Sequence, residues 1–388
     1  MNWKLLISTS FLKTKNPLAR ISKFLSISGM AVGCFSLIVA LSVMNGFESL
    51  VKNKLKGFQG DLQISGKINS SALYKIKGVD KIVSFIERKG VIESKDNVSI
   101  VTFKAIDINN MENFYDIPFN GNSPKNGEIM IGNDIAVRLN LNLGDSVLIY
   151  SPLDQNFGFG LPIKKKMVIS GIFSSKVLDF DNQYSFIQKE DGMKLFKRKL
   201  NQNNMDVRVS IGTNLKSIKT DIYSKIGKII SIKSWVELNQ SLIQAMKMEK
   251  IGTSIILSLI FVVASFNLAI SLSLNSIQNL KEIGLLKSIG VSEKSIQKII
   301  IIMGFQLAGI GVIIGIILAL SFIYFQNKFG FIPIPSEIYF LDFLPMSIDF
   351  LTINVVFILS MTFILIVSLI SGKNISKISI KEALQWTK

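Results

Sequence analysis

The sequence contains no histidine and a single cysteine among its 388 residues. Without histidine the chain has no imidazole to serve as a general base or a zinc ligand, and one cysteine cannot form an internal disulfide. The chain also lacks the loop that cradles nucleotide phosphates, since Gly66-Lys67 is followed by Ile68 and Gly372-Lys373 by Asn374. We therefore expect no nucleotide hydrolysis by the chain itself and no resident cofactor or metal.

Charge is scarce as well. Charged residues make up 18% of the chain and hydrophobic residues 48%, and the mean hydropathy is +0.42, which is too apolar for a soluble protein of this length. Charge-free runs that reach the roughly 20 residues needed to cross a bilayer predict four spans. These spans are residues 24–47, 251–280, 299–327 and 351–372. None of them contains an acidic residue, which argues against a proton-coupled transporter.

The first apolar run has a second interpretation, as a signal peptide. Ala31-Val32-Gly33-Cys34 is similar to the site at which a bacterial lipoprotein precursor is cut and lipidated. Here, however, the apolar run continues past Cys34 to Phe47, where a lipoprotein would continue as a polar tether. We expect Cys34 to be a small buried hydrophobe.

The distribution of basic residues predicts the orientation in the membrane. Five basic and no acidic residues precede the first span, and the loop 281–298 holds four lysines and two glutamates. The loop 328–350 holds one lysine and three acidic residues. We therefore predict a cytoplasmic N-terminal segment (1–23), a cytoplasmic loop at 281–298 and a cytoplasmic tail (373–388). The segment 48–250 and the loop 328–350 are expected on the outer side.

The long segment between the first two spans is expected to fold as a mixed α+β domain. A helix is predicted at 134–141, with Asn133 or Asp134 as its N-cap and Gly144-Asp145 as the following turn. A second helix, 235–250, leads into the second span, either as a passive connector or as an element that transmits motion. Alternating apolar residues predict strands at 61–65, 97–108, 128–131, 146–150, 166–173 and 223–234. The basic runs 164–166 and 197–199 are expected in solvated loops, with contact to acidic lipids or partners as the alternative.

Small residues recur at helical spacing within two spans. Gly29 and Gly33 lie in the first span, and Gly311 and Gly315 lie in the third. This spacing allows helix backbones to approach closely. It favours packing within the chain or packing against a second copy, and the pattern alone does not choose between them.

The cytoplasmic loop between spans two and three predicts a short amphipathic helix. Leu280, Ile283, Leu286 and Ile289 fall near one face, and Gly290 follows as a stop signal. Ser292 then caps a helix that runs into the third span. The apolar face is expected to dock into a groove of a cytoplasmic partner or to lie on the lipid surface.

At this loop the sequence resembles the permease family that includes FtsX, MacB and the lipoprotein-releasing permeases LolC and LolE. The motif of that family is matched by Lys281, Glu282, Ile283, Leu286 and Gly290. The resemblance implies a coupling helix that docks on a separate ATPase subunit, which binds ATP and Mg. It assigns the coupling role to a set that also includes Leu285 and Lys287.

Four further stretches resemble the lipoprotein-releasing branch of this family. They are residues 42–48, 131–145, 235–250 and 264–267. The resemblance implies a permease subunit of an ABC transporter in the bacterial inner membrane, paired with an identical or homologous second permease chain. Such a complex moves lipoproteins towards the outer membrane and passes them to a periplasmic carrier. Whether the chain is LolC-like, LolE-like or forms a homodimer stays open.

The resemblance also assigns roles to individual residues. It places the substrate cavity at Met44, Asn45, Phe47, Phe266 and Asn267. Transmission of motion is assigned to Trp235, Asn239, Met246 and Glu249, and a carrier hook to Phe157, Leu161 and Pro162. Replacing Leu286 by Asp is expected to abolish association with the ATPase.

Two other classes of function remain at this stage. One is an FtsX-like or MacB-like permease that exports a drug or peptide or activates a cell-wall hydrolase. The other is a membrane-anchored sensor or enzyme, which needs a constellation of polar residues in the outer segment that the sequence does not reveal.

Overall fold

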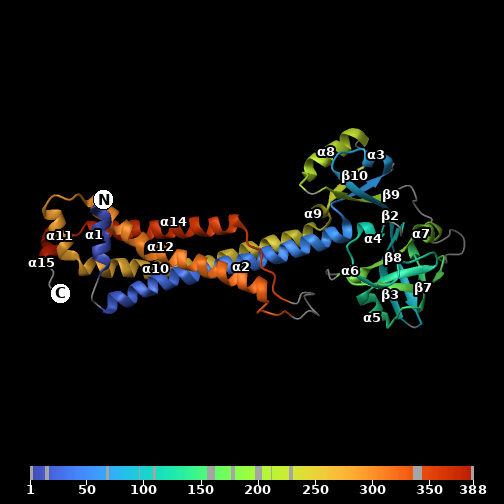
Figure 1. Cartoon of the computed structure of the whole chain (residues 1–388), viewed down its shortest axis with the longest axis horizontal. Helices are drawn as coiled ribbons and strands as arrows, with labels where there is room; N and C mark the ends of the chain where they lie inside the picture. The colour runs from blue at the N-terminus through green and yellow to red at the C-terminus, as the bar shows by residue number, and fades with distance from the viewer. Residues whose placement is uncertain are drawn as a thin grey trace. The chain divides into compact units, whose positions relative to one another are not determined.

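The computed structural model divides into two compact units (Figure 1). We call Met1–Ser49 with Ala245–Lys388 the membrane unit and Leu50–Gln244 the sheet unit. The structure describes residues 3–13, 17–66, 70–95, 97–107, 111–154, 162–175, 180–196, 203–210, 212–226, 230–334 and 343–385.

Four long helices carry the predicted spans. They are α2 (Pro17–Gln59), α10 (Gln240–Gln278), α12 (Glu293–Phe329) and α14 (Phe350–Ser376). Each is long and apolar enough to cross a membrane, which confirms the predicted fold class of four spans around a mixed α and β insertion. Two of these helices extend well beyond the predicted span, because α2 continues past Phe47 to Gln59 and α10 begins at Gln240.

Three short helices complete the described part of the membrane unit. They are α1 (Trp3–Leu12), α11 (Leu280–Ser288) and α15 (Ile380–Gln385). Figure 1 shows all three at one end of the unit, near both chain termini. α1 packs on α12, and α11 packs on α15.

The sheet unit is built on one mixed sheet. Its strands follow the order β10-β1-β9-β2-β3-β8-β5-β7-β4, and β6 pairs with β2 and β7. The pairs β3/β8 and β5/β7 are parallel and the others are antiparallel. The strands are β1 (Leu62–Gly66), β2 (Val79–Ser94), β3 (Asn97–Ile106), β4 (Phe119–Gly121), β5 (Glu128–Gly132), β6 (Ser146–Tyr150), β7 (Lys165–Phe173), β8 (Tyr184–Gln188), β9 (Asn203–Val209) and β10 (Ser231–Ser234).

Short helices connect and cover these strands. They are α3 (Ser70–Tyr74), α4 (Met111–Phe114), α5 (Asn133–Leu139), η2 (Pro152–Asp154), α6 (Phe180–Gln183), α7 (Lys189–Leu195), α8 (Leu215–Ile226) and α9 (Trp235–Leu238). Three separate clusters of buried apolar side chains form the interior, so the sheet unit has a hydrophobic core of its own. The last turn of α2 belongs to one of them through Phe58.

Several local predictions are confirmed and others are wrong. The strand at 97–108, the helix at 134–141 and the turn at Gly144, whose φ is +89°, are all present. The predicted strand at 223–234 is wrong in its first half, because α8 continues to Ile226 and only Ser231–Ser234 is a strand. The cap of α5 is Gly132, without a side-chain hydrogen bond, so neither Asn133 nor Asp134 caps it.

The prediction of a solvated loop at 164–166 holds only for the exposed Lys164, because Lys165 and Lys166 belong to a strand. Lys165 begins β7 and forms an ion pair with the buried Asp191, while Lys164 lies 2.9 Å from Glu93. The run 197–199 lies outside the described residues.

Candidate functional site

The loop between α10 and α12 folds as predicted along the chain. Asn279 precedes α11, and its side-chain amide donates to the carbonyls of Asn275 (2.7 Å) and Phe11 (3.2 Å). Gly290 ends the turn with a φ of +90°, where a side chain would be strained. Ser292 holds the N-cap position of α12, but its hydroxyl contacts Ser295 Oγ at 3.1 Å instead of a backbone amide.

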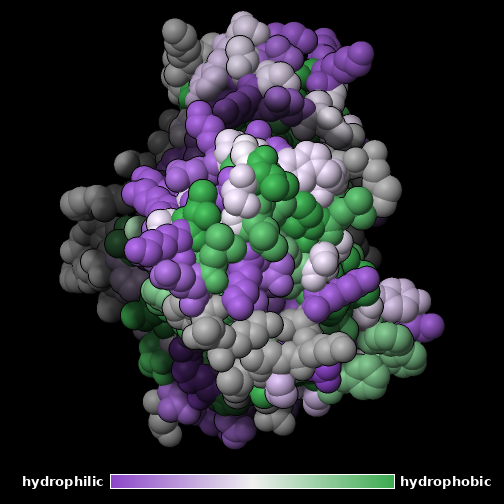
Figure 2. Space-filling model, turned by 90° about the vertical axis from the view of Figure 1, so that its left-hand side faces the viewer, coloured by the Kyte–Doolittle hydropathy of each residue, from purple (hydrophilic) through white to green (hydrophobic). Residues whose placement is uncertain are grey.

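The face of α11 that looks outward differs from the prediction. Leu280 and Ile283 are buried, and Leu286 is half-buried against the core of the membrane unit. The side chains that face outward are Leu285 and Ile289, which are 57% and 77% exposed. Figure 2 shows a hydrophobic patch at this end of the molecule, surrounded by hydrophilic residues.

Lys287 was assigned to ATPase coupling, yet it faces the interior of the chain. Its ammonium donates to the carbonyls of Ser376 and Ile378, both at 2.7 Å, and so satisfies the end of α14. Lys281 and Glu282 are exposed, as a contact with a partner requires. The described structure therefore divides the predicted coupling residues into an outward set and a structural set.

The predicted cavity residues form two separate groups. Lys250 donates to Asn45 Oδ1 at 2.6 Å, whereas Asn267 accepts from Ser26 Oγ at 3.0 Å through its backbone carbonyl. Because an α-helix rises about 1.5 Å per residue, Lys250 and Asn267 lie about 25 Å apart along α10. The structure does not bring Asn45 and Asn267 together within this chain.

The stretch 42–48 of α2 is joined to neighbouring elements by hydrogen bonds and close packing. Asn45 Nδ2 donates to Thr352 Oγ1 at 3.1 Å, so Asn45 joins α2 to α14 as well as to α10. Gly46 lies directly against the carbonyl of Pro345, where a Cβ would overlap it, and Ser42 accepts from the amide of Ser347 at 2.9 Å.

Three predicted cavity residues have exposed or half-buried side chains. Phe266 is exposed, Phe47 is also exposed, and Met44 is half-buried. Their assignment to the cavity stays a prediction.

The four packing glycines lie at helix contacts within the chain. Gly29 faces Ala264, and Gly33 faces Phe261, both on α10. Gly311 and Gly315 on α12 lie against backbone carbonyls of α2, where added Cβ atoms would overlap. The described contacts of these glycines are intramolecular.

Of the predicted transmission residues, Trp235 and Asn239 lie at the joint between α9 and α10, and Met246 and Glu249 lie within α10. Trp235 is buried, with the ammonium groups of Lys52 and Lys56 at 5.9 and 6.0 Å from its ring centre. Asn239 ends α9 and donates to Gln59 Oε1 at 2.8 Å. The predicted helix 235–250 is therefore interrupted at Asn239, and the break is held against the last residue of α2. Met246 is buried and Glu249 is exposed.

Sequence reasoning missed the anchoring of α2 in the sheet unit. Phe58 stacks on Phe180 with ring centres 4.1 Å apart and also contacts Tyr184. Val51, Leu55 and Phe58 are all buried, and their helical spacing was a signal available in the sequence.

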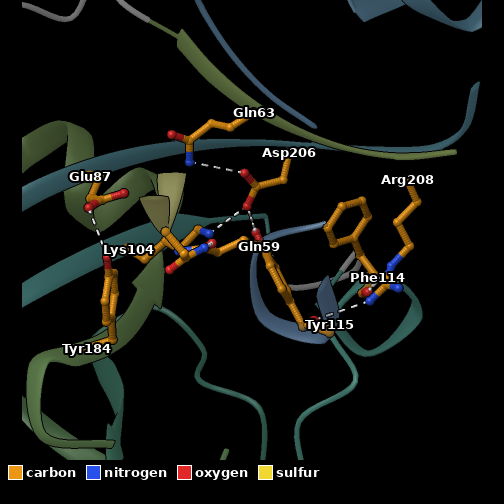
Figure 3. A network of polar contacts seen from close by, with 11 residues as sticks. Gln59, Gln63, Glu87, Lys104, Phe114, Tyr115, Tyr184, Asp206 and Arg208 are labelled. Carbon is orange, nitrogen blue, oxygen red and sulfur yellow. Dashed lines mark hydrogen bonds and ion pairs between the residues drawn. The ribbon is translucent and has the colours of Figure 1, made fainter. Parts of the chain in front are cut away.

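Beside Phe58 lies a buried polar network that the sequence did not reveal (Figure 3). Lys104 Nζ lies 2.6 Å from Asp206 Oδ2, and both side chains are almost fully buried. The hydroxyl of Tyr115 also donates to Asp206 Oδ2 at 3.0 Å, and Gln63 donates to Oδ1 at 3.3 Å. Burial raises the pKa of Tyr115, so this phenol stays protonated and remains a donor.

Arg208 extends this network to the end of α2. It donates to the carbonyl of Phe114 at 2.6 Å and to that of Gly57 at 3.2 Å, as Figure 3 shows for Phe114. Because every polar atom of Asp206 is engaged and enclosed, the network stabilises the fold and offers no open position for a substrate.

The structure describes little of the suggested carrier hook. Phe157 and Leu161 of the suggested carrier hook lie outside the described residues, and Pro162 is half-buried. Among the residues that the structure describes, no group of His, Cys, Asp and Glu side chains is arranged to hold a metal ion.

Two families match the chain in tandem. The MacB-like periplasmic core domain matches residues 23–224, and the FtsX-like permease C-terminal domain matches residues 254–380. The first match covers more than half of the chain and contains most of the sheet unit, and the second contains α11, α12 and α14.

Curated relatives match nearly the whole length. The chain is 29% identical to the lipoprotein-releasing system transmembrane protein LolC of Buchnera aphidicola subsp. Schizaphis graminum, over 86% of each chain. It is 24% identical to LolC of Neisseria meningitidis serogroup B over 96% of each chain. It is also 24% identical to LolE of Haemophilus influenzae over 94% of each chain. The chain therefore belongs to the family of FtsX-like permeases with a MacB-like periplasmic core domain, and within it is similar to the transmembrane proteins of lipoprotein-releasing systems.

Proposed function

We propose that this chain is the permease subunit of an ATP-driven complex that extracts lipoproteins from the bacterial inner membrane. The observation that carries the proposal is the exposed apolar tip of α11, in a chain similar along most of its length to lipoprotein-releasing transmembrane proteins. An exposed apolar patch with a polar rim, such as the one to which Leu285 and Ile289 contribute, marks a site of interaction.

The orientation in the membrane is part of this proposal. Both termini and α11 face the cytoplasm, and the sheet unit is periplasmic. Exposed lysines near α11 support this orientation, because basic residues concentrate on the cytoplasmic side. They are Lys281, Lys294, Lys298, Lys373, Lys377 and Lys381.

Extraction of a lipoprotein needs an external source of energy. Each buried methylene of an acyl chain contributes about 0.8 kcal/mol to membrane binding, so spontaneous release of a chain with several acyl groups is negligible. The sequence has no phosphate-cradling loop, and ATP and Mg are therefore assigned to a separate ATPase subunit. The same scheme includes a second permease chain, identical or homologous, and a periplasmic carrier that receives the lipoprotein.

The first experiment measures whether an ATPase copurifies with the tagged full-length chain in mild detergent. Leu285→Asp replaces the outward side chain and is expected to abolish copurification. Leu286→Asp is the poorer variant, because Leu286 packs against the core of the membrane unit and its replacement would disturb the helices themselves. Val137→Asp, at a 73% exposed helix position in the sheet unit, is the matched control.

The second experiment identifies the cargo. The purified complex is reconstituted in proteoliposomes with a triacylated lipoprotein, and ATP-dependent release of that lipoprotein into the soluble fraction is measured. Release that requires ATP and is lost with Leu285→Asp supports the proposal. An ATPase that copurifies but releases no lipoprotein would instead favour export of a peptide or drug, and the absence of any ATPase would contradict the proposal entirely.

A further inference from the structure

The C-terminal helix α15 is fixed in place on α11. Ser379 and Glu382 form a reciprocal cap, with the Glu382 amide 3.2 Å from Ser379 Oγ and the Ser379 amide 3.0 Å from Glu382 Oε2. The buried Ala383 faces Gly284, where an added Cβ would lie 3.0 Å from the Ala383 Cβ. Gly284 therefore allows α15 to lie close against α11.

Lys287 joins the same two elements from the other side. Its bonds to the carbonyls of Ser376 and Ile378 hold the segment that leads from α14 into α15. Its side chain is only 10% exposed, so this contact is largely shielded from water. With Gly284, Lys287 makes α11 and α15 a single structural piece.

Together the two helices expose more apolar surface than α11 alone. Leu285 and Ile289 on α11 are accompanied by Ile380 and Leu384 on α15, which are 41% and 43% exposed. An added Cβ on Gly284 would also lie 3.4 Å from Leu384, so the apolar residues of α15 continue the surface of α11. Figure 2 shows hydrophobic side chains gathered at this end within a hydrophilic surround.

The direction of this surface favours a protein over lipid. Figure 2 views the molecule from the left-hand side of Figure 1, where the helices of the membrane unit end, and the patch faces the viewer. Lipid surrounds the sides of membrane-spanning helices, whereas a surface at their ends faces water. The charged residues around it favour a partner with an acidic rim, because exposed lysines outnumber glutamates there. The lysines are Lys281, Lys294, Lys298, Lys373, Lys377 and Lys381, and the glutamates are Glu282, Glu293 and Glu382.

We propose that α11 and α15 form one composite docking surface for the ATPase subunit, in which Ile380 and Leu384 are contact residues. Gly284 and Lys287 are positioning residues, since they hold α15 without reaching the partner. This inference rests on the proposed function, and it assigns to the end of the chain a share of a contact that the sequence motif places in α11 alone.

The test compares copurification of the ATPase with four forms of the tagged full-length chain: wild type, Leu285→Asp, Leu384→Asp and Val137→Asp. Burial of an unpaired carboxylate at a central contact costs more than about 1.4 kcal/mol, so Leu384→Asp is expected to lower the recovered ATPase at least about ten-fold. Val137→Asp is expected to match the wild type. If Leu285→Asp loses the ATPase and Leu384→Asp retains it, the composite surface is refuted while the proposed function stands. If neither variant loses it, docking on both α11 and α15 is refuted while an ATPase-linked permease stands. If the wild type recovers none, the proposed function fails as well.

A second measurement remains informative if Leu384→Asp disturbs folding. Leu384→Cys is made in a Cys34→Ala background, which removes the native thiol, and is reconstituted in proteoliposomes with and without the ATPase. A membrane-impermeant maleimide is expected to label the new thiol about ten-fold more slowly when the ATPase is bound, while a Val137→Cys control is labelled equally in both samples. Equal, rapid labelling at position 384 in both samples would refute docking on α15. Slow labelling in both would show that lipid covers the helix and would refute it equally.

Discussion

The membrane unit and the sheet unit bury their polar side chains in different ways. In the described part of the membrane unit the buried polar side chains are neutral: serine, threonine, asparagine and glutamine. The described part of the sheet unit buries Lys104 and the carboxylates of Asp154, Asp181, Asp191 and Asp206. Three of these carboxylates pair with a basic side chain, and Asp181 accepts from Ser175.

The difference follows from what each unit has around it. A charge in a hydrocarbon environment costs several kcal/mol unless it faces a cavity or a partner, so the lysines of the membrane unit lie outside the four apolar runs, as with Lys250 and Lys287. The sheet unit forms a core of its own, where paired charges are tolerated and fix particular strands to one another. In the sheet unit, paired charges specify how the strands pack. In the membrane unit, the close approach of helix backbones does so for the helices.

The largest effect is expected when the buried ion pair between Lys104 and Asp206 is broken. Asp206→Ala leaves Lys104 charged and enclosed, which is expected to destabilise the sheet unit by about 3–5 kcal/mol. The double replacement Lys104→Met with Asp206→Leu removes both charges and is expected to cost less, about 1–3 kcal/mol, because Tyr115 and Gln63 lose their acceptor. Thermal unfolding in detergent, followed by the fluorescence of Trp235 in a W3F/W386F background, measures both. An equal loss of thermal stability in the single and the double variant would show that the unpaired charge of Lys104 is not the cause of the destabilisation.

The next test removes a charge at the end of the membrane unit. Lys287→Met leaves the carbonyls of Ser376 and Ile378 without their donor, and hydrogen bonds to charged groups contribute about 1.5–3 kcal/mol. We expect earlier thermal aggregation of the detergent-solubilised chain than in the wild type. Lys281→Met, at an exposed position of the same helix, is the control and is expected to aggregate at the wild-type temperature.

Close packing in the membrane unit can be tested without any charge. A Cβ at Gly315 would lie 2.5 Å from the carbonyl oxygen of Ala31, so Gly315→Ala forces α2 and α12 apart and is expected to cost about 1–3 kcal/mol. Among the described residues, no atom outside its own helix lies within 4 Å of a Cβ at Gly309, and Gly309→Ala is expected to be neutral or slightly stabilising. The same aggregation assay compares them, and equal effects would argue against close packing at Gly315.

The smallest expected effect concerns an exposed charge in the sheet unit. Glu237 accepts from the backbone amide of Ser234 at 2.6 Å and from Lys219 at 2.9 Å, and these contacts lower the pKa of its carboxyl. A depressed pKa gives stability that is present above the ordinary value of about 4.3 and is lost as the pH falls through the lower folded value.

Glu237→Gln is therefore expected to lower the midpoint of Trp235-detected unfolding near pH 6, with the gap to wild type closing as the pH falls below the ordinary range of a glutamate. Ser234→Ala removes the other half of the cap and is expected to cost about 1 kcal/mol near neutral pH. A gap that persists unchanged at low pH would mean that the charge of Glu237 contributes nothing.

Each part of the fold that could be predicted from the sequence follows from a single dominant physical constraint. Lipid requires long uncharged runs, and so the four spans were visible. The alternation in residues 97–106 and the turn at Gly144 are local signals that need no knowledge of the rest of the chain. The extension of α2 to Gln59 was harder to predict from the sequence, because the apolar residues that recur there at helical spacing alternate with charged residues.

The parts that were missed depend on contacts between distant segments. The periodicity of α11 identified an apolar helix, but α14 and α15, which decide which of its faces is covered, begin 62 and 92 residues after it ends. Lys104 lies in a strand whose alternation gives no sign that a lysine faces inward towards Asp206. The residues assigned to the cavity were grouped by motif, and only the helix contacts show that Asn45 and Asn267 are far apart along α10.

The order of strands in the sheet has a consequence for biogenesis. β1 is the first strand to be synthesised, yet its two neighbours are β9 and β10, the last two strands before α9 and α10. Both edges of β1 therefore remain without their native partners until nearly all of the insertion has been made, and an unpaired strand edge is open to wrong pairing with other chains. The ribosome must deliver the second span almost as soon as the sheet can close, which ties maturation of the sheet unit to insertion of α10.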